Sequence, residues 1–454
     1  MSKNKKLYIT SLAEYQTNFW IKVCKELNEK GISLSILSFD DRSSEMLRKE
    51  RIDSINIPSL SKKENNFSEA SFSNFNFNKW LLHEKITFGI QDENFLKRKY
   101  ISYFNVIDSI FKKNIKNGTK PILIQELGGF VSVISSFFAA RSNNIDNYFI
   151  EPSFFRSKVF FTKNSFESPK FDVNQSKIAS SKVREYINNS LKDNKLVIPK
   201  KDLHQYTSSI SKVLKLSVFK RLIKKIFDKF FLRKHQEFGY IFHYVKLHLI
   251  AIYNSFFLKK LYRNFEELNN FIYFPLHVPG DVALTLRSVK NLDQLSLIEN
   301  ICNLANKKYK VAIKEHPAQR GTTNLKRLIF LLKKYNNLSL LDPSLNNYEV
   351  MSKSKGIITI NSKSGVEAIL LNKPVFVLGD SFYKHSDFVN KIERIDDLPS
   401  HLDKLVERIP NESKDIESFF QNIWDASKPG ELYVDDEKDI ENISESIHSI
   451  LKKI

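Results

Sequence analysis

Short apolar runs alternate with stretches of helical spacing in the first third of the chain. The apolar runs predict strands at 7–10, 33–39, 54–57, 121–124 and 147–150, and the helical spacing predicts helices over about 17–30, 94–114 and 130–141. The segment 59–78 is rich in Ser, Asn and Phe, which predicts a surface loop. Strands that alternate with helices in this way are typical of a doubly wound α/β domain.

The same alternation restarts at Phe271 and continues through the second half. Predicted strands lie at 271–275, 310–314, 338–341, 356–360 and 374–378, with predicted helices between them at 291–307, 323–335, 347–353 and 365–371. A chain of 454 residues is too long for one ordinary core. The pattern therefore predicts an α/β protein with two doubly wound, Rossmann-like lobes that face a cleft.

Between these two halves the alternation stops and the chain becomes helical and basic. The predicted organisation is a first lobe at 1–164, a basic helical insertion or linker at 165–265, a second lobe at 266–433 and a last helix at 434–454. The last helix has apolar residues at helical spacing, Ile440, Ile443, Ile447 and Leu451. It would be able to cross back to the first lobe.

Basic residues outnumber acidic ones, with 71 Lys and Arg against 51 Asp and Glu, and the net charge is +20. This balance favours anionic partners such as nucleotides, acidic glycans or anionic lipid surfaces. The sequence contains no P-loop, no GxGxxG fingerprint, no zinc cluster and no nucleophile elbow. We therefore expect catalysis without an essential metal or a resident cofactor, and no nucleic-acid partner.

Three features of the sequence bear on its compartment. Cys24 and Cys302 form neither a disulfide framework nor a metal-binding spacing, which agrees with a reducing compartment. The apolar stretch behind the basic N-terminus, Leu7–Ile9, is too short for a secretory signal. The apolar segment 241–258 contains one Lys and two His residues and is a poor membrane span. We therefore expect a cytoplasmic protein.

Two polar turns follow neighbouring strands of the second predicted sheet. The first is Lys314-Glu315-His316-Pro317, in which the proline fixes the backbone, and the second, 361–368, starts a helix. Free backbone N–H groups at that helix start, together with Lys314 and a protonated His316, would bind one anionic group, such as a phosphate of a nucleotide-linked donor. Lys314 and Glu315 alternate along the strand, so we expect only Lys314 to support this site. Alternatively, His316 simply ends a strand.

The second turn allows two interpretations. Ser364 to Glu367 is a Ser-x-x-Glu capping box, in which the serine caps the helix and the glutamate reaches back to the N-cap amide. In the functional interpretation, the hydroxyls of Ser362 and Ser364 lie beside Gly365 where a phosphate would dock.

Gln125 and Glu126 end the fourth strand of the first lobe, at the carboxyl edge where open sheets bind ligands. The glycines at 128–129 leave the backbone there open to close approach. We take Glu126, together with Gln125, as the catalytic candidates. The carboxylate of Glu126 can act as a general base, or it can only cap the next helix. Glu151, before Pro152, has the same edge position and is the reserve candidate.

Residues 218–234 combine an apolar helical face with a basic one and contain a single acidic residue, Asp228. This composition is typical of an interfacial helix on an anionic membrane. A helix that packs its apolar face on the lobe beneath it would have the same pattern.

Several of these segments resemble the capsule polysaccharide synthesis family, which is itself similar to bacterial Kdo transferases of the GT-B type. The resemblance rests on the 314–317 turn, the run 360–383, the strand 271–277, the late segment 427–433 and the Gln125-Glu126 pair. It implies two GT-B lobes with the donor on the second and the acceptor on the first, and a role for Glu367 on the donor ribose. At Gly280-Asp281 the chain departs from the Pro-Glu pair usual in the family, so the resemblance gives Asp281 no role.

The resemblance implies a glycosyltransferase of surface polysaccharide assembly. It would transfer a sugar, such as Kdo from a CMP donor, to a lipid-linked or glycan acceptor at the inner face of the membrane. Two alternatives stay open: a UDP-sugar 2-epimerase of GT-B shape, and a non-catalytic protein of capsule assembly or export.

Overall fold

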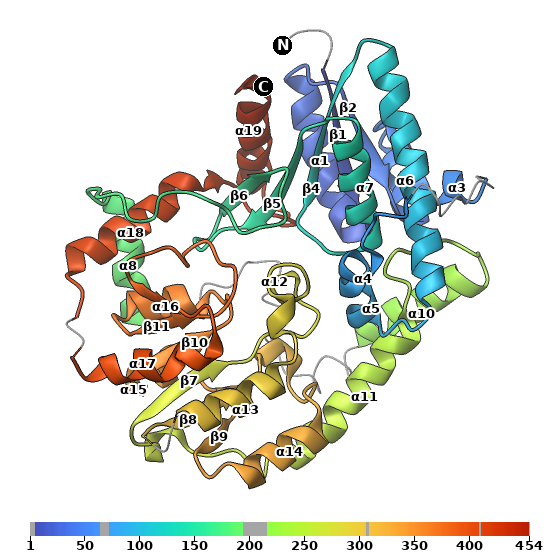
Figure 1. The fold of residues 1–454 in the computed structure, drawn as a ribbon. Coiled ribbons are helices and arrows are strands. Elements are labelled where there is room, and N and C mark those ends of the chain that lie inside the picture. Colours follow the sequence, from blue (N-terminus) through green and yellow to red (C-terminus); the bar gives the residue numbers. More distant parts are fainter. Residues whose placement is uncertain (1–4, 64–71, 194–215, 306–307, 408–409, 454) are drawn as a thin grey trace.

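The structure, a computed structural model, describes residues 5–63, 72–193, 216–305, 308–407 and 410–453. Part of the loop expected at 59–78 and part of the insertion expected at 165–265 thus lie outside the described residues. Within them the chain forms two α/β lobes, the first uppermost and the second below it in Figure 1.

The sheet of the first lobe has, among the described residues, the strand order β3-β2-β1-β4-β5-β6-β13. Its strands are β1 (Lys5–Ser11), β2 (Leu34–Ser38), β3 (Ser54–Asn56), β4 (Lys120–Glu126), β5 (Asn147–Pro152), β6 (Lys158–Lys163) and β13 (Lys428–Pro429). The strands from β3 to β5 are parallel, whereas β6 and β13 add an antiparallel edge. The sequence analysis did not predict these two strands, which lie outside its strand–helix alternation.

The sheet of the second lobe is parallel throughout, with the order β12-β11-β10-β7-β8-β9 among the described residues. Its strands are β7 (Phe271–Pro275), β8 (Lys310–Lys314), β9 (Leu338–Leu341), β10 (Gly356–Thr359), β11 (Val375–Val377) and β12 (Val389–Lys391). The first five of these agree with the predicted strands. They are rich in Val, Ile, Leu and Phe because helices cover both faces of the sheet.

Helices cover both sheets, and their bounds are close to the predicted ones where a prediction was made. The first lobe carries α1 (Glu14–Glu29), α2 (Asp41–Lys49), α3 (Ile57–Ser61), α4 (Phe77–Trp80), α5 (Leu82–Phe88), α6 (Glu93–Lys116) and α7 (Val131–Ser142). The second carries α12 (Val282–Thr285), α13 (Gln294–Leu304), α14 (Leu325–Lys334), α15 (Asn347–Lys353), α16 (Ser364–Leu370) and α17 (Leu398–Asp403). The segment between the lobes forms α8 (Ser181–Asp193), α10 (Leu216–Phe230) and α11 (Ile241–Leu258).

Both sheets reverse their direction of winding beside their first strand. The crevice between β1 and β4 is the switch point of the first lobe, and that between β7 and β10 is the switch point of the second. Loops that leave such a pair of strands run to opposite faces of the sheet and open a space for a ligand. These two lobes with facing switch points form a GT-B-like architecture.

The end of the chain returns to the first lobe through α18 (Ser413–Ala426), β13 and α19 (Glu437–Lys453). Lys428 of β13 already pairs with Val159, so the chain joins the first sheet before residue 433, the predicted end of the second lobe. Ile443 and Ile447 of α19 are buried in the same apolar cluster as Trp20 of α1. The last helix is therefore part of the first lobe.

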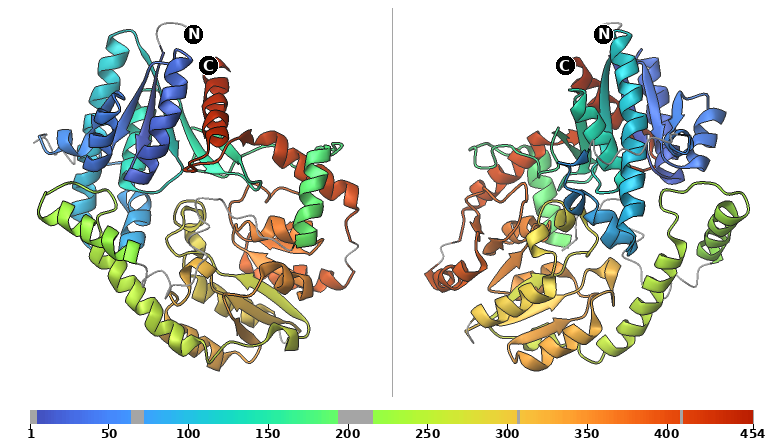
Figure 2. Two further views of the ribbon diagram at one scale, coloured as in Figure 1. Left: turned by 180° about the vertical axis from the view of Figure 1, so that it is seen from behind. Right: turned by 45° about the vertical axis from the view of Figure 1, so that its right-hand side comes forward.

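The connection between α10 and α11 is held on the first lobe by buried charges. Lys99 Nζ of α6 lies 2.7 Å from Glu84 Oε1 and 3.0 Å from Glu237 Oε1, and Tyr240 donates to Glu84 at 2.9 Å. From there α11 runs down to the second lobe, as Figures 1 and 2 show, where Asn254 donates to the Gly321 carbonyl at 2.9 Å. The helix α11 thus connects the two lobes.

We expect Lys99→Met to lower the free energy of unfolding by about 3 to 5 kcal/mol, because it leaves Glu84 and Glu237 buried without their cation. The same change at Lys112 on α6, whose side chain is 67% exposed in its ion pair with Asp108, should lower it by at most about 1 kcal/mol. Urea unfolding of both variants measures the difference, and an equal loss in the two would contradict the buried network.

Candidate functional site

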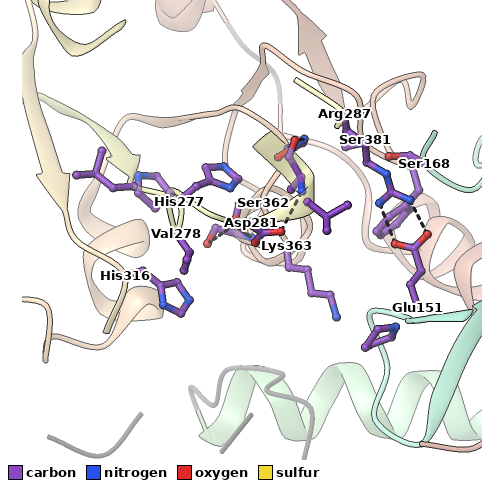
Figure 3. A pocket seen from close by; sticks show the side chains of 18 of the residues that line it. Glu151, Ser168, His277, Val278, Asp281, Arg287, His316, Ser362, Lys363 and Ser381 are labelled. Atoms are coloured by element: carbon purple, nitrogen blue, oxygen red, sulfur yellow. Dashed lines mark hydrogen bonds and ion pairs between the residues drawn. The ribbon is translucent and has the colours of Figure 1, made fainter. Parts of the chain in front are cut away.

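The carboxyl ends of both sheets meet at a cleft of about 410 Å³. The first lobe contributes the ends of β4 and β5, and the second contributes the loops after β7, β8, β10 and β11. Figure 3 shows labelled side chains from both lobes in this space. Of the residues proposed from the sequence, the cleft is lined by Glu126, Glu151, Lys314, His316, Pro317, Ser362, Ser364 and Glu367.

Lys314 and Glu315, consecutive at the end of β8, have different partners. Lys314 Nζ donates to the Leu345 carbonyl at 2.7 Å beside the cleft. The Glu315 carboxylate accepts from the amides of Gly321 and Thr323, at 2.8 and 3.2 Å. Glu315 therefore fixes the following loop, and Lys314 is the cation at the cleft.

Two histidines from neighbouring strand ends lie in the cleft, and Figure 3 shows both. Burial lowers the pKa of His316 below its ordinary value and lowers that of His277 to about 4, so both rings are neutral near pH 7. His316 Nδ1 accepts from the Ala318 amide at 3.2 Å, which places the ring proton on Nε2. His316 can therefore offer a ligand a neutral N–H group, and the positive charge considered for it is not supported.

The start of α16 does not form the predicted capping box, although Ser362 and Ser364 both line the cleft. Ser362 Oγ accepts from the Ser364 amide at 3.1 Å, and the Ser362 carbonyl accepts from the Gly365 amide at 3.0 Å. The N-cap is Lys363, without a side-chain cap, so the predicted capping box does not form. These two amides are already bonded within the turn, so the expectation of free N–H groups is wrong for them.

Glu367 is buried in the floor of the cleft, and its Oε2 atom has no hydrogen-bond partner among the described residues. Burial raises the pKa of Glu367 to about 7, although Lys314 and Lys363 oppose the shift. Burial also lowers the pKa of Lys314 to about 8, against the attraction of Glu367. This acid and this base both titrate near neutral pH, at positions where a ligand could bind.

Gly365 has a packing role that the sequence did not indicate. It does not line the cleft, and a Cβ atom at this position would overlap the ring of Tyr383. The Tyr383 hydroxyl donates to the Ser362 carbonyl and closes the turn. The proposed ligand contact of Gly365 is therefore not supported.

The two residues proposed at the end of β4 diverge. Gln125 is fully buried away from the cleft, where its Nε2 donates to Asn147 Oδ1 at 2.8 Å, so its catalytic role is not supported. Glu126 lines the cleft, and its Oε2 accepts from Gln16 Nε2 at 3.0 Å and from the Tyr433 hydroxyl at 2.8 Å. Successive strand residues point to opposite faces, which is why only one of the pair reaches the cleft.

Several contacts join the lobes at the cleft, and two of them involve a candidate residue or the second polar turn. Arg287 of the second lobe forms a bidentate ion pair with Glu151, at 2.8 and 2.6 Å, which Figure 3 shows as dashed lines. Lys363 Nζ donates to the Ser153 carbonyl at 2.6 Å. Both carboxylate oxygens of Glu151 are therefore occupied by Arg287 in this arrangement.

Sequence reasoning missed Arg287, Lys363, Asn361 and Ser381, which all line the cleft. The position of Lys363 between Ser362 and Ser364, which the sequence analysis did propose, could have indicated that Lys363 also reaches the cleft. No local pattern indicated Arg287, because its partner Glu151 lies in the other half of the chain.

Several buried polar atoms at the cleft have no partner among the described residues. These atoms are His277 Nε2, Asn361 Oδ1, Glu367 Oε2 and Ser381 Oγ. An unpaired buried polar group costs roughly 1 to 3 kcal/mol, so several of them in one cleft favour a polar ligand that would bond them.

Among the described residues, no group of three or more His, Cys, Asp or Glu side chains is arranged to hold a metal ion. The independence of the reaction from metals stays a prediction.

The raised pKa of Glu367 leads to a pH-dependent prediction. Above its ordinary value of 4.5 the unfolded chain loses this proton, whereas the folded protein keeps it up to about pH 7, so this contribution to stability is lost as the pH rises to 7. In Glu367→Gln this pH-dependent loss of stability is absent, because glutamine does not titrate. Relative to the parent, the variant should gain roughly 2 kcal/mol of unfolding free energy between about pH 5.5 and about pH 8.

Lys314 should act in the same direction, because without Glu367 its pKa would fall further. Chemical unfolding at both pH values measures the change. Glu349→Gln, which removes an exposed carboxylate of the same lobe, should show no such pH dependence. A constant difference between Glu367→Gln and the parent would contradict the buried titration.

Comparison with known proteins identifies the family. Residues 137–388, more than half of the chain, match the model of the family described as "Capsule polysaccharide biosynthesis protein". This match runs from α7 of the first lobe through the polar turns of the second.

Two curated proteins are similar over shorter stretches. Protein FixF of Sinorhizobium fredii is 33% identical over 121 residues, which are 26% of this chain and 29% of FixF. The capsule polysaccharide export protein KpsS of Escherichia coli is 35% identical over 82 residues, which are 17% of this chain and 21% of KpsS. The chain thus matches less than a third of the length of either relative.

Among solved structures, a β-Kdo 2,7 transferase of KpsC from Thermosulfurimonas dismutans is 14% identical, with a TM-score of 0.36, over 76% of this chain and 89% of that one. A likeness at this distance assigns no activity. The family match does identify the group: the chain belongs to the capsule polysaccharide biosynthesis protein family.

Proposed function

We propose that this protein is a glycosyltransferase of capsule or surface polysaccharide biosynthesis that uses a nucleotide-linked sugar. The observation that carries the proposal is the cluster of unpartnered buried polar atoms beside Lys314 and Lys363 in a cleft between two lobes. A ligand with an anionic group and several hydroxyls would satisfy both features. Membership of the capsule biosynthesis family supports the same substrate class.

The donor would bind mainly on the second lobe. Lys314 and Lys363 offer positive charge, and His316 offers the N–H group of its Nε2, so together they suit a phosphate. Glu367, with one unpartnered oxygen in the floor of the cleft, suits a sugar hydroxyl. The sequence resemblance favours a CMP-linked acidic sugar such as Kdo, and the positive cleft would also accept an NDP-sugar.

Glu126 is our candidate for the general base on the acceptor side. It reaches the cleft from the first lobe, and the two donors that hold its Oε2, Gln16 and Tyr433, are uncharged. By contrast, Glu151 is neutralised by Arg287. A carboxylate held in this way can take the proton of an acceptor hydroxyl or stabilise an oxocarbenium-like centre.

The reaction is proposed to take place in the cytoplasm. Both cysteines are buried free thiols, which a reducing compartment preserves.

We expect His316→Ala to weaken binding of the nucleotide donor by about 1 to 3 kcal/mol, the loss typical of a hydrogen bond to a charged group. Calorimetry against CMP-, UDP- and GDP-linked sugars measures the affinity. His448→Ala, on α19 outside the cleft, is the matched control and should bind like the parent. Equal binding by His316→Ala and the parent would remove His316 from the site.

We expect Glu126→Gln to lower turnover by roughly 10²- to 10⁴-fold, with donor affinity unchanged, because the amide keeps the shape but cannot take a proton. The assay is nucleotide release from the donor that binds, with glycolipid extract as acceptor. If Glu151→Gln abolished turnover while Glu126→Gln left it intact, the two roles would have to be exchanged.

Incubation of the parent with donor alone separates the alternatives. Turnover without acceptor would indicate an epimerase. Donor binding without turnover under either condition would instead favour a non-catalytic protein of capsule assembly or export.

A further inference from the structure

The helices α10 and α11 expose an extended apolar surface. Large apolar side chains on them that remain more than a third exposed are Ile223, Phe227, Phe230, Phe242, Tyr244, Val245, Leu247, Leu249, Ile250, Tyr253, Phe256 and Phe257. Phe242 and Phe256 are 70% and 67% exposed. Single exposed apolar residues are ordinary, but a contiguous set of this kind marks an interaction surface.

The apolar residues of α11 form a stripe opposite its buried side. Ala251, Asn254 and Leu258 lie about one turn apart and are buried against the second lobe. The most exposed apolar side chains, Phe242, Leu249, Tyr253 and Phe256, recur at the same helical spacing on the opposite face. A helix of a soluble protein would carry polar residues there.

The apolar side of α10 is also exposed. Ile223, Phe227 and Phe230 are each about half exposed, so the alternative that this face packs on the lobe is not supported for them. A buried ion pair holds α10 to the first lobe instead. Arg42 of the first lobe donates to both carboxylate oxygens of Asp228 on α10, at 3.0 and 2.5 Å.

The exposed charges that the segment 216–263 itself carries have one sign. The sequence from 216 to 263 contains two carboxylates, Asp228 and Glu237, and both are buried and ion-paired. The exposed cations beside the apolar residues are Lys220, Lys225, Arg233, Lys246, Lys259 and Lys260. Lys224 of α10 instead pairs with Glu14 at 2.8 Å.

We propose that α10 and α11 together form a membrane-docking surface that lies on an anionic lipid bilayer. Exposed aromatic residues would enter the boundary between headgroups and acyl chains, while the surrounding Lys and Arg residues would contact anionic headgroups. A second copy of this chain is a poorer occupant, because it would bring the same positive surface into contact with itself. The proposal extends the basic helix predicted at 218–234 to α11 and does not depend on the chemistry of the cleft.

The helix α11 would lie along the bilayer surface and not cross it. By length and composition it is the one helix among the described residues that could span a membrane. However, its start packs on the first lobe, where the rings of Phe88 and Tyr240 stack at 4.2 Å, and Asn254 binds the second. A spanning helix would have to leave both contacts. Because α11 connects the lobes, a docked α11 would hold the cleft at a fixed position near the membrane (Figures 1 and 2).

Vesicle co-sedimentation of the full chain tests the proposal. The parent should bind phosphatidylcholine vesicles that contain phosphatidylglycerol, and high salt should weaken this binding. The triple variant Lys246→Gln, Lys259→Gln, Lys260→Gln should bind these vesicles roughly tenfold or more weakly at low salt. Its matched control changes three exposed lysines at the end of α6, Lys112, Lys113 and Lys116, to Gln and should bind like the parent.

A second variant tests the apolar contribution. Phe242→Ser with Phe256→Ser should lower binding at both low and high salt, because it removes the inserted aromatic groups and leaves every charge in place. Ile178→Ser is the matched control, since Ile178 is 89% exposed and lies outside the surface. In Phe242→Trp, the indole fluorescence should shift to the blue when the vesicles are added.

Several outcomes would overturn the proposal. Absence of parent binding at low salt, or equal loss in the test and control variants, would exclude a membrane contact at this surface. Resistance of the bound protein to alkaline carbonate extraction would indicate a spanning helix. A dimer of the parent in light scattering that Phe242→Ser with Phe256→Ser converts to a monomer would show that a second copy covers the surface.

Discussion

The cleft depends on one topological constraint, the reversal of winding in each parallel sheet. In the second lobe the loop after β7 and the loop after β10 start from adjacent strands and diverge, which opens a space at their carboxyl ends. His277 and Ser362 therefore meet in this space although they are far apart in the sequence. The same reversal in the first lobe places Gln16, in the first turn of the helix α1 that follows β1, against Glu126 at the end of β4.

The low polarity around the cleft gives its charged groups unusual properties. Burial moves the pKa of Lys314 down and that of Glu367 up, so both titrate close to neutral pH. A ligand that brings a compensating charge or a hydroxyl gains more from such groups than it would from exposed ones, because their loss of hydration has already occurred on folding. The free energy of unfolding that the protein loses by burying these groups can therefore be regained as binding free energy when a ligand pairs with them.

The lobes are connected both across the cleft and behind it. Arg287 and Lys363 reach from the second lobe to Glu151 and Ser153 of the first, while α11 joins the lobes along the outside. These contacts fix the distance between Glu126 on the first lobe and the residues of the second lobe that are proposed to bind the sugar donor. A change in them would alter the width of the cleft, which is how two-lobed enzymes admit substrate and exclude water.

The sequence by itself determined the two α/β lobes, the positions of the parallel strands and the two polar turns, because these depend on local apolar spacing and on turn residues. Strand alternation indicated that Lys314 and Glu315 would face different surroundings, and the choice of Lys314 for the cleft rested on its charge. The sequence could not determine which of Gln125 and Glu126 faces the cleft, because each face of a fully buried strand is covered. Only the tertiary structure decided that Gly365 packs under Tyr383, that Glu151 is paired with Arg287, and that the apolar side of α11 is exposed. Each of these depends on contacts between residues distant in the sequence, which no local pattern records.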